Sequence, residues 1–303
     1  MREGIIDIGT NTFHLLIVDR AADNEVLHKE KVAVRIGKNG ISKGFISDDA
    51  VERAIETLTR FRAKIKEYEV EKVTATATSA VRNAENKQEF VDAIRETTGI
   101  EINILSGHDE AFLIYQGVKE FLTIEDPALI MDIGGGSIEF ILADGDHIIW
   151  LRSYEIGGQR LIDQFHKSDP IATNEINDLN QFLNETLTEV FEKCEQYGAQ
   201  YLIGSSGSFD TFWDMYSAKV NASINESPIL TQDSFQEIYD DLISKNKEER
   251  LVIPGMVRMR VDMIVGAAVV TKNVMDNCGF SQIKVSPFAL KEGVLFHGLP
   301  KSN

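Results

Sequence analysis

The sequence predicts an α/β protein built from two related halves, with helices covering mostly buried sheets. Two observations support this prediction. Apolar strand patterns alternate with helix patterns along the chain, which is typical of layered α/β folds. A strand–turn–strand segment around Asp7 also recurs 125 residues later around Asp132, and a repeat of this kind indicates a duplicated domain.

Each copy of the repeat is an apolar run that ends in Asp, a turn of small residues, and a second apolar run. The turn is GTNT at 9–12 in the first copy and GGGS at 134–137 in the second. Short turns between two apolar runs predict β-hairpins. We therefore expect each half of the molecule to open with a hairpin.

Strand and helix patterns continue to alternate after the first hairpin. Ser47 is a typical helix N-cap, and apolar residues follow it at helical spacing up to Ile65. The other predicted elements of this half are a strand at 73–78, a helix at 85–98, a strand at 100–105 and a helix at 106–121. Pro127 marks the expected boundary with the second half.

The second half repeats this alternation after its own hairpin. Helices are predicted at 159–166, 174–197, 209–217, 232–244, 260–277 and 288–297, and strands at 200–204 and 282–286. We expect two domains, 1–124 and 125–303, with the terminal helix 288–297 able to pack back on the first domain. Since no long linker separates the halves, they should pack tightly around a cleft.

The composition argues against several classes of protein. The 303 residues carry a formal net charge of −17, which argues against binding to nucleic acid or to an anionic membrane. No apolar run approaches the roughly 20 residues of a membrane-spanning helix, and no signal-peptide pattern opens the sequence. The two cysteines, Cys194 and Cys278, have no CxxC partner, so we expect a cytoplasmic protein.

The glycine-rich turn of the second hairpin is suited to binding phosphate. Three consecutive glycines are costly in a simple turn, but they let backbone N–H groups approach a ligand, and Ser137 adds a hydroxyl donor. Asp132 precedes the turn and would repel a bare phosphate. A Mg²⁺ ion removes this conflict, because proteins hold it through one or two carboxylates together with phosphate oxygens.

Two further turns support the phosphate hypothesis. The first hairpin repeats the design of an acid, a glycine and small polar residues. A third small-residue turn at 204–208 joins a strand to a helix, which is a common place for anion binding. Taken alone, each turn is also compatible with an ordinary loop. Together the turns predict these phosphate-binding residues: Gly9, Thr10, Asn11, Thr12, Gly134, Gly135, Gly136, Ser137, Gly207 and Ser208.

Four sequence blocks extend this pattern: DIGTNTFH at 7–14, TATSAVRNAEN at 76–86, SGHDEA at 106–111 and DIGGGSIE at 132–139. They resemble the exopolyphosphatase / guanosine pentaphosphate phosphohydrolase family, within the superfamily of actin, sugar kinases and heat-shock ATPases. Further matching blocks follow in family order, so the resemblance spans nearly the whole chain. It implies two actin-like (ribonuclease H-like) domains, with mixed β-sheets flanked by helices and an interdomain cleft.

The resemblance also implies roles for individual residues. Glu110, in the first turn of a predicted helix, matches the proposed general base that activates water. Arg82 matches an arginine that holds phosphate. Asp132 and Glu139 match acids that hold Mg²⁺, and we place Asp7 with them. Without the resemblance, Glu110 would be a common helix N-terminal acid and Arg82 a surface arginine.

Six basic residues are further candidates for a channel that accepts an anion: Arg35, Lys38, Arg160, Arg258, Arg260 and Lys291. Taken singly, most of them are more typical of a solvated charge or a salt bridge. His14 lies in an apolar strand with no second metal ligand nearby, so we predict a structural role for it.

The sequence therefore predicts an exopolyphosphatase-type phosphohydrolase with Mg²⁺ as cofactor. It would release terminal orthophosphate from inorganic polyphosphate, from guanosine pentaphosphate or from both, by in-line attack of water. The resemblance also implies a homodimer. Two alternatives stay open, namely a small-molecule kinase of the same superfamily and a non-catalytic protein that binds guanosine tetra- or pentaphosphate.

Overall fold

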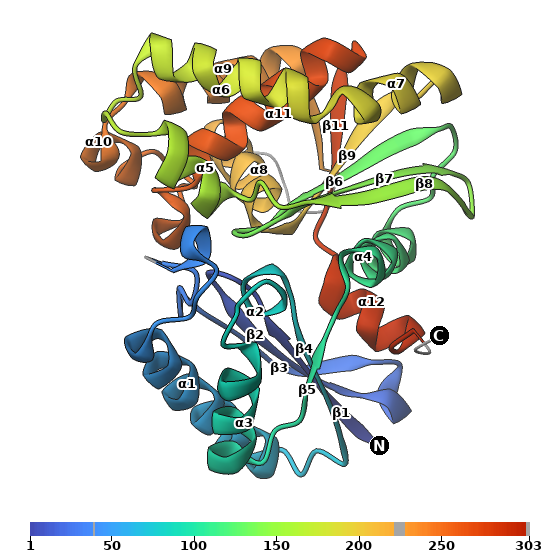
Figure 1. Cartoon of the computed structure of the whole chain (residues 1–303). Helices are drawn as coiled ribbons and strands as arrows, with labels where there is room; N and C mark the ends of the chain where they lie inside the picture. The colour runs from blue at the N-terminus through green and yellow to red at the C-terminus, as the bar shows by residue number, and fades with distance from the viewer. Residues whose placement is uncertain (39, 221–227, 301–303) are drawn as a thin grey trace.

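The computed structural model describes residues 1–38, 40–220 and 228–300, and it forms two lobes that are each built on one mixed β-sheet (Figure 1). The N-terminal lobe, coloured blue to cyan, holds a five-stranded sheet, and the other lobe holds a six-stranded sheet. This arrangement confirms the predicted fold class of two mixed sheets flanked by helices.

The first sheet consists of β1 (Arg2–Ile8), β2 (Phe13–Asp19), β3 (Glu25–Val32), β4 (Lys72–Ala77) and β5 (Ile102–Ile104). The spatial order is β3-β2-β1-β4-β5. The first three strands form an antiparallel meander, and β4 and β5 continue the sheet parallel to β1. Most residues of β1 and β2 are buried, which explains their nearly continuous apolar sequences.

The helices in this part of the chain are α1 (Asp48–Glu67), α2 (Ser79–Arg82), α3 (Lys87–Thr98) and α4 (Gly107–Phe121), with short 3₁₀ turns η1 (Arg20–Ala22) and η2 (Ile41–Lys43). α1 follows Ser47, as predicted, and buries the apolar side of its helical pattern against the sheet. α3 ends at Gly99, whose φ of 69° is in the left-handed region that favours glycine.

The second sheet consists of β6 (Ala128–Ile133), β7 (Ile138–Asp144), β8 (His147–Tyr154), β9 (Tyr201–Ser205), β10 (Ile229–Thr231) and β11 (Gln282–Ser286). Its spatial order is β10-β11-β9-β6-β7-β8. The helices in this part of the chain are α5 (Gly158–Phe165), α6 (Thr173–Thr186), α7 (Thr188–Tyr197), α8 (Ser206–Val220), α9 (Gln232–Ser244), α10 (Lys247–Leu251), η3 (Arg258–Arg260), α11 (Ile264–Cys278) and α12 (Leu290–His297).

The two sheets confirm the predicted duplication. The strands β8-β7-β6-β9-β11 repeat the order and directions of β3-β2-β1-β4-β5, and β10 adds an antiparallel edge strand. The register is also repeated, because Asp7 lies opposite His14 in the first hairpin and Asp132 lies opposite Glu139 in the second. The duplicated hairpins therefore place these side chains at equivalent positions.

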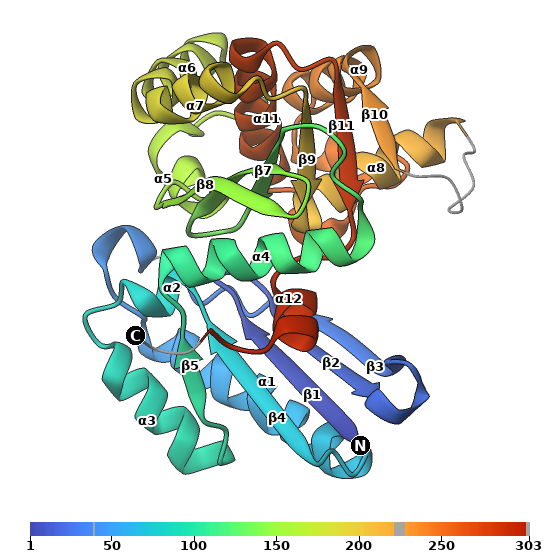
Figure 2. The same cartoon turned by 90° about the vertical axis from the view of Figure 1, so that its right-hand side faces the viewer.

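α4 and α12 lie side by side between the two sheets (Figure 2). Their backbones are in contact, since a side chain on Gly293 would overlap the carbonyl oxygen of Leu113 and one on Gly117 would overlap that of Ala289. α4 packs on β7 and β8, whereas α12 packs on β1. The terminal helix thus returns to the first sheet, while the division into domains 1–124 and 125–303 stays a prediction.

The structure departs from the predicted elements mainly at the sheet edges. The sequence patterns did not predict β3, β8 or β10, and β3 contains no fully buried residue that would mark it as an apolar run. The helix predicted at 174–197 is divided at Leu187 into α6 and α7, although buried residues keep helical spacing across the break. Within the described residues, no helix has the length and hydropathy needed to cross a membrane.

Candidate active site

A cavity of about 110 Å³ lies between the lobes, where the two hairpin turns meet. The turn 9–12 reaches it from β1 of the first sheet, and the turn 134–137 reaches it from β6 of the second. The predicted site residues in its wall are Asp7, Gly9, Thr10, Asn11, Thr12, Glu110, Asp132, Gly134, Gly135, Gly136, Ser137 and Gly207. The fold therefore brings most of the predicted site together from distant parts of the sequence.

Both hairpin turns are closed in the same way. The Gly9 N–H donates to the Thr12 carbonyl oxygen at 3.1 Å, and the Gly134 N–H donates to the Ser137 carbonyl oxygen at 3.0 Å. Neither closing bond uses the two middle residues of its turn. The N–H groups of those residues can therefore donate hydrogen bonds to an anion in the cavity.

The second turn needs its glycines because it lies directly against the first lobe. A Cβ atom on Gly135 would lie 2.8 Å from Asn11 Nδ2, and one on Gly136 would lie 2.6 Å from Thr10 Oγ1. Both distances are too short for a real side chain. The lobes are therefore closed on each other at the two turns.

The turn between β9 and α8 forms a third part of the wall. Ser206 has a φ of 68°, in the left-handed region, and Gly207 packs so closely on Arg260 that no side chain would fit there. Ser206 and Gly207 line the cavity, whereas Ser208 is buried in the first turn of α8 and is not part of the wall. Ser206 thus occupies the place that we predicted for Ser208.

Four carboxyl groups lie in or directly behind the wall, largely withdrawn from solvent. Burial raises the pKa of Asp7 to about 7, and repulsion by Asp132 adds to this effect. Burial also raises the pKa of Glu110 to about 7, against the attraction of Arg82. The pKa of Asp132 is raised by burial, and that of Glu139 is raised well above its usual range by burial and by repulsion from Glu110.

This group of acids fits a divalent cation. Several buried carboxylates with raised pKa values indicate a local deficit of positive charge. The side-chain oxygen of Asn11 is also buried without a hydrogen-bond partner. In the described parts of the chain, no three His, Cys, Asp or Glu side chains converge closely enough to hold a metal by themselves. A divalent cation that keeps several waters and combines one or two carboxylates with phosphate oxygens is compatible with this set of acids.

The duplicated hairpins differ at one equivalent position. His14 lies opposite Asp7, with Nδ1 3.9 Å from the carboxylate oxygen, and its pKa is lowered well below the usual range by burial and by Lys291. Glu139 lies opposite Asp132 and accepts a hydrogen bond from Ser153 at 2.7 Å. His14 also lines the cavity. The sequence analysis predicted a structural role for this residue and did not place it in the site.

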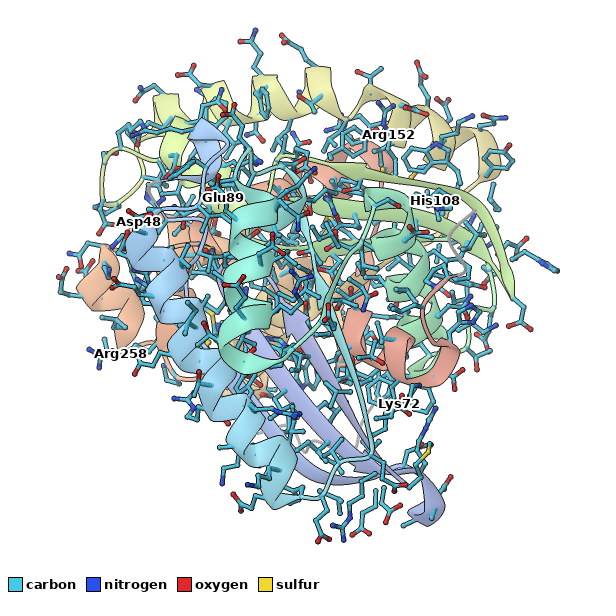
Figure 3. All side chains as sticks on the ribbon, turned by 60° about the horizontal axis from the view of Figure 1, so that its bottom comes forward. Asp48, Lys72, Glu89, His108, Arg152 and Arg258 are labelled. Atoms are coloured by element: carbon cyan, nitrogen blue, oxygen red, sulfur yellow. The ribbon has the colours of Figure 1, made fainter. Side chains whose placement is uncertain are left out.

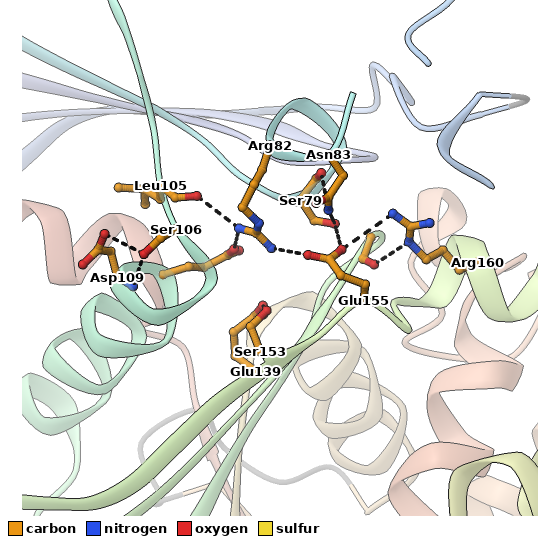
Figure 4. Close-up of polar contacts among 12 residues, drawn as sticks. Ser79, Arg82, Asn83, Leu105, Ser106, Asp109, Glu139, Ser153, Glu155 and Arg160 are labelled. Carbon is orange, nitrogen blue, oxygen red and sulfur yellow. Dashed lines mark hydrogen bonds and ion pairs between the residues drawn. The ribbon is translucent and has the colours of Figure 1, made fainter. Parts of the chain in front are cut away.

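Arg82, at the end of α2, lies between the carboxylates of Glu110 on α4 and Glu155 after β8 (Figure 4). Its Nη1 atom is 2.7 Å from Glu110 and its Nη2 atom is 2.7 Å from Glu155. Glu155 also accepts a hydrogen bond from Ser79 and lies 3.6 Å from Arg160. Burial alone would raise the pKa of Glu155. Its hydrogen bonds with Ser79, Arg82 and Asn83 outweigh this effect, so that the pKa lies below its usual range. Arg82 does not line the cavity itself but is linked to it through Glu110.

Residues without a sequence signal also line the cavity. Part of its wall is basic, because Arg260, Lys291 and Lys31 line it together with Asp210. Burial lowers the pKa of Arg260 and raises that of Asp210 to about 6. Arg260 and Lys291 were channel candidates, but Lys31 lies on β3, whose pattern predicted no strand. Nothing in the local sequence marks Asp210 as a site residue.

Two related lobes that close on a phosphate-type cavity define an actin-like protein of the phosphoryl-transfer class. Comparison with protein families makes this assignment specific. The chain belongs to the Ppx/GppA phosphatase family, whose model matches residues 16–302. The predicted family resemblance is thereby confirmed.

Solved structures and a curated relative agree with this assignment. An exopolyphosphatase from Cytophaga hutchinsonii is 41% identical, with a TM-score of 0.94 over 98% of this chain and 97% of that chain. A family member from Aquifex aeolicus has the same fold, with 24% identity and a TM-score of 0.78 over 97% and 96% of the two chains. A bifunctional 3-dehydroquinate synthase/phosphatase from Fusobacterium nucleatum is 30% identical over 97% of this chain, which spans 46% of that protein.

Proposed function

We propose that this protein releases terminal orthophosphate from inorganic polyphosphate, from guanosine pentaphosphate or from both. The observation that best supports this proposal is the position of Glu110, which lines the cavity beside both hairpin turns and lies 2.7 Å from Arg82. A carboxyl group with a pKa of about 7 is well suited to accept a proton from an attacking water near neutral pH.

Different residues of the cavity have different roles in the proposed reaction. Backbone N–H groups of the turns 9–12 and 134–137 bind oxygens of the terminal phosphate and hold it in line with the attacking water. Glu110 orients that water and accepts its proton. Arg82 keeps Glu110 in place through their ion pair, and in this arrangement its guanidinium contacts Glu110 and Glu155 and does not line the cavity. Closure of the lobes excludes bulk water, so that these electrostatic interactions are strengthened.

A divalent cation completes the proposal. Asp132, together with Asp7 or Glu139, would hold Mg²⁺, which supplies charge neutralisation between neighbouring phosphate groups. The family resemblance also supports a homodimer, and the lack of a cysteine framework is compatible with the cytoplasm. Sedimentation and cell fractionation would test these two points.

A phosphate-release assay tests the proposed function. Short polyphosphate, long polyphosphate and guanosine pentaphosphate are compared at equal phosphate concentration, with Mg²⁺ and with a chelator. We expect release from at least one substrate and loss of release with the chelator. No release from any substrate in the presence of Mg²⁺ would refute the proposal. Transfer of labelled phosphate from ATP to an acceptor other than water would instead favour a kinase.

A further inference from the structure

The two cysteines of the chain lie together in the second lobe, although they are far apart in the sequence. Cys194 lies on α7 and Cys278 ends α11, and these helices are in contact in the layer that faces away from the first lobe (Figure 1). Both residues line one surface hollow of about 700 Å³. Their thiols are close enough to share a hydrogen bond. The fold therefore makes neighbours of two sulfur atoms that the sequence alone does not connect.

The two thiols differ in their access to solvent. Cys194 is 4% exposed and belongs to the apolar core, whereas Cys278 is partly exposed and packs against that core. The hollow is also lined by Glu195 and Gln200, which are exposed. The hydrogen bond with Cys278 and burial both raise the pKa of Cys194, which therefore stays a neutral thiol. A small oxidant in the hollow would meet Cys278 first.

Polar contacts hold both helices in place around this pair. On α7, Glu189 accepts a hydrogen bond from Trp150 at 3.1 Å and forms an ion pair with Arg152, which Figure 3 shows beside this helix. On α11, Asn273 donates a hydrogen bond to Asn184 of α6 at 2.9 Å. Formation of a disulfide requires two cysteines that the backbone already holds close together. Thiols in contact on two fixed helices can be joined without a large movement of the backbone.

A structural role alone does not account for this pair. A buried cysteine is usually an inert apolar residue, and that description suits Cys194 by itself. Cysteines that respond to oxidants are accessible to solvent and often adjoin a second cysteine that reacts with the first oxidation product. Cys278 meets both conditions, because it lines the surface hollow and its thiol contacts that of Cys194.

We propose that Cys194 and Cys278 form a site of reversible oxidation, at which hydrogen peroxide joins them in a disulfide. In the first step the deprotonated Cys278 sulfur attacks one peroxide oxygen. The O–O bond breaks, the sulfur becomes a sulfenic acid, and the other oxygen leaves as water. In the second step the Cys194 sulfur attacks the Cys278 sulfur, the S–O bond breaks, and the hydroxyl group leaves as water with the Cys194 proton. The two thiols together lose two electrons and two protons, and one peroxide becomes two waters.

The disulfide would connect α7 to α11 and close the chain between them into a loop. A cross-link over such a long segment stabilises a protein mainly by restricting its unfolded state. Among the described residues that line the cavity, none belongs to α7 or α11. Oxidation should therefore raise stability and leave the phosphate site unchanged. The proposal is independent of the proposed function.

Mass spectrometry after treatment with hydrogen peroxide tests whether the disulfide forms. The wild type is oxidised, blocked with a maleimide under denaturing conditions and digested without reductant. We expect the peptides of Cys194 and Cys278 to be joined, and dithiothreitol to separate them. In Cys194→Ser, dimedone should label Cys278 as a sulfenic acid, whereas Cys278→Ser should leave Cys194 reduced. Wild-type cysteines that both carry maleimide after peroxide treatment would overturn the proposal, as would a disulfide between two molecules.

Thermal unfolding and phosphate release test the consequence of the disulfide. The Tm of the oxidised wild type should exceed that of the reduced protein by roughly 5 °C, and Cys278→Ser should show no such rise after the same treatment. Phosphate release should be equal in the oxidised and reduced forms. An unchanged Tm, or a loss of release that dithiothreitol restores, would contradict the proposed effect. Absence of release from both forms would refute the proposed function, whereas the mass and Tm measurements would still decide the role of the cysteine pair.

Discussion

At the scale of single residues, the proposed base and its counter-ion form one unit. Glu110 and Glu155 each lie 2.7 Å from the Arg82 guanidinium, and Glu155 belongs to the other lobe. Glu155 therefore positions Arg82, and through it Glu110, only when the lobes are together. This arrangement links the alignment of the base to closure of the cleft.

The variant Glu110→Gln tests the general base. Glutamine keeps the size of the side chain and an oxygen for Arg82, but it cannot take a proton. We expect kcat to fall by roughly 10²–10⁴-fold with phosphate binding retained. Glu120→Gln, an exposed position on the same helix, is the matched control. Near-normal turnover of Glu110→Gln would remove Glu110 from the mechanism.

The buried acids predict how Mg²⁺ stabilises the protein at different pH. The pKa of about 7 for Asp7 and Glu110 exceeds the value of about 4 for unfolded carboxyl groups, so stability should decrease as the pH rises from about 4 to about 7. Protons compete with the cation below pH 7. Thermal unfolding should therefore show a larger Mg²⁺-induced rise in Tm at pH 8 than at pH 6.

Asp7→Asn provides the comparison for this experiment, because it removes one acid without changing the shape of the site. The difference between the two pH values should become smaller in this variant. An equal Mg²⁺ effect at both pH values in the wild type would show that these acids do not hold the cation.

The sequence predicts only part of the site at this scale. The two turns, Asp132 and Glu110 lie in compact blocks with local signals, such as consecutive glycines or a helix N-terminus. Glu155 and His14 gain their places through pairing between strands or contact between lobes, which local spacing does not reveal. Ser206 lines the cavity because of a left-handed backbone that is unusual for serine.

At the scale of secondary-structure elements, the contact between α4 and α12 depends on glycine. Gly293→Ala would place a methyl group on the Leu113 carbonyl oxygen, so we expect a loss of roughly 1–3 kcal/mol in unfolding free energy. Gly266→Ala is the matched control, since a Cβ atom there meets its nearest neighbour, Leu161, at 3.9 Å. That control should be neutral or stabilising by up to about 1 kcal/mol.

Denaturant unfolding of both variants measures this difference. Equal stabilities of Gly293→Ala and Gly266→Ala would show that the two helices can separate without cost. The same result would also argue against α12 as a fixed link between the lobes.

The elements that the sequence predicts well are those with a strong internal pattern. The central strands β1, β2, β6 and β7 are long apolar runs, and α1, α3 and α4 have clear caps and helical spacing. β3 and β8 each pair with a neighbouring strand on one side only. Their exposed charged residues obscure the alternation of apolar and polar residues that would predict a strand. The return of α12 to the first sheet is a long-range contact that local periodicity cannot specify.

At the scale of the whole molecule, the lobes are joined by contacts at several points around the cleft. Ser42 donates a hydrogen bond to Asp163 at 2.9 Å, and Arg160 donates to the Ile41 carbonyl oxygen at 3.2 Å. These contacts connect η2 of one lobe to α5 of the other. Separation of η2 from α5 would break these two hydrogen bonds, whereas the packing of α4 on α12 does not involve them.

The variant Gly136→Ala tests the need for full closure. Its methyl group would lie 2.6 Å from Thr10 Oγ1, an atom of the other lobe, and would keep the turns apart. We expect kcat to fall by about 10²-fold, because a displacement near 1 Å in an active site has this effect. The Tm should change little. A normal kcat would mean that the turns need not meet.

The unequal partners of the duplicated hairpins have a consequence for direction. Burial and the nearby cations Lys291, Lys31 and Arg260 lower the pKa of His14, whereas burial and the nearby acids Glu110 and Asp132 raise that of Glu139. The electrostatic potential is therefore more positive near His14 and more negative near Glu139. Under the proposed function, this difference in potential would orient a bound phosphate substrate with its departing portion toward the cations and its reacting phosphorus toward Glu110.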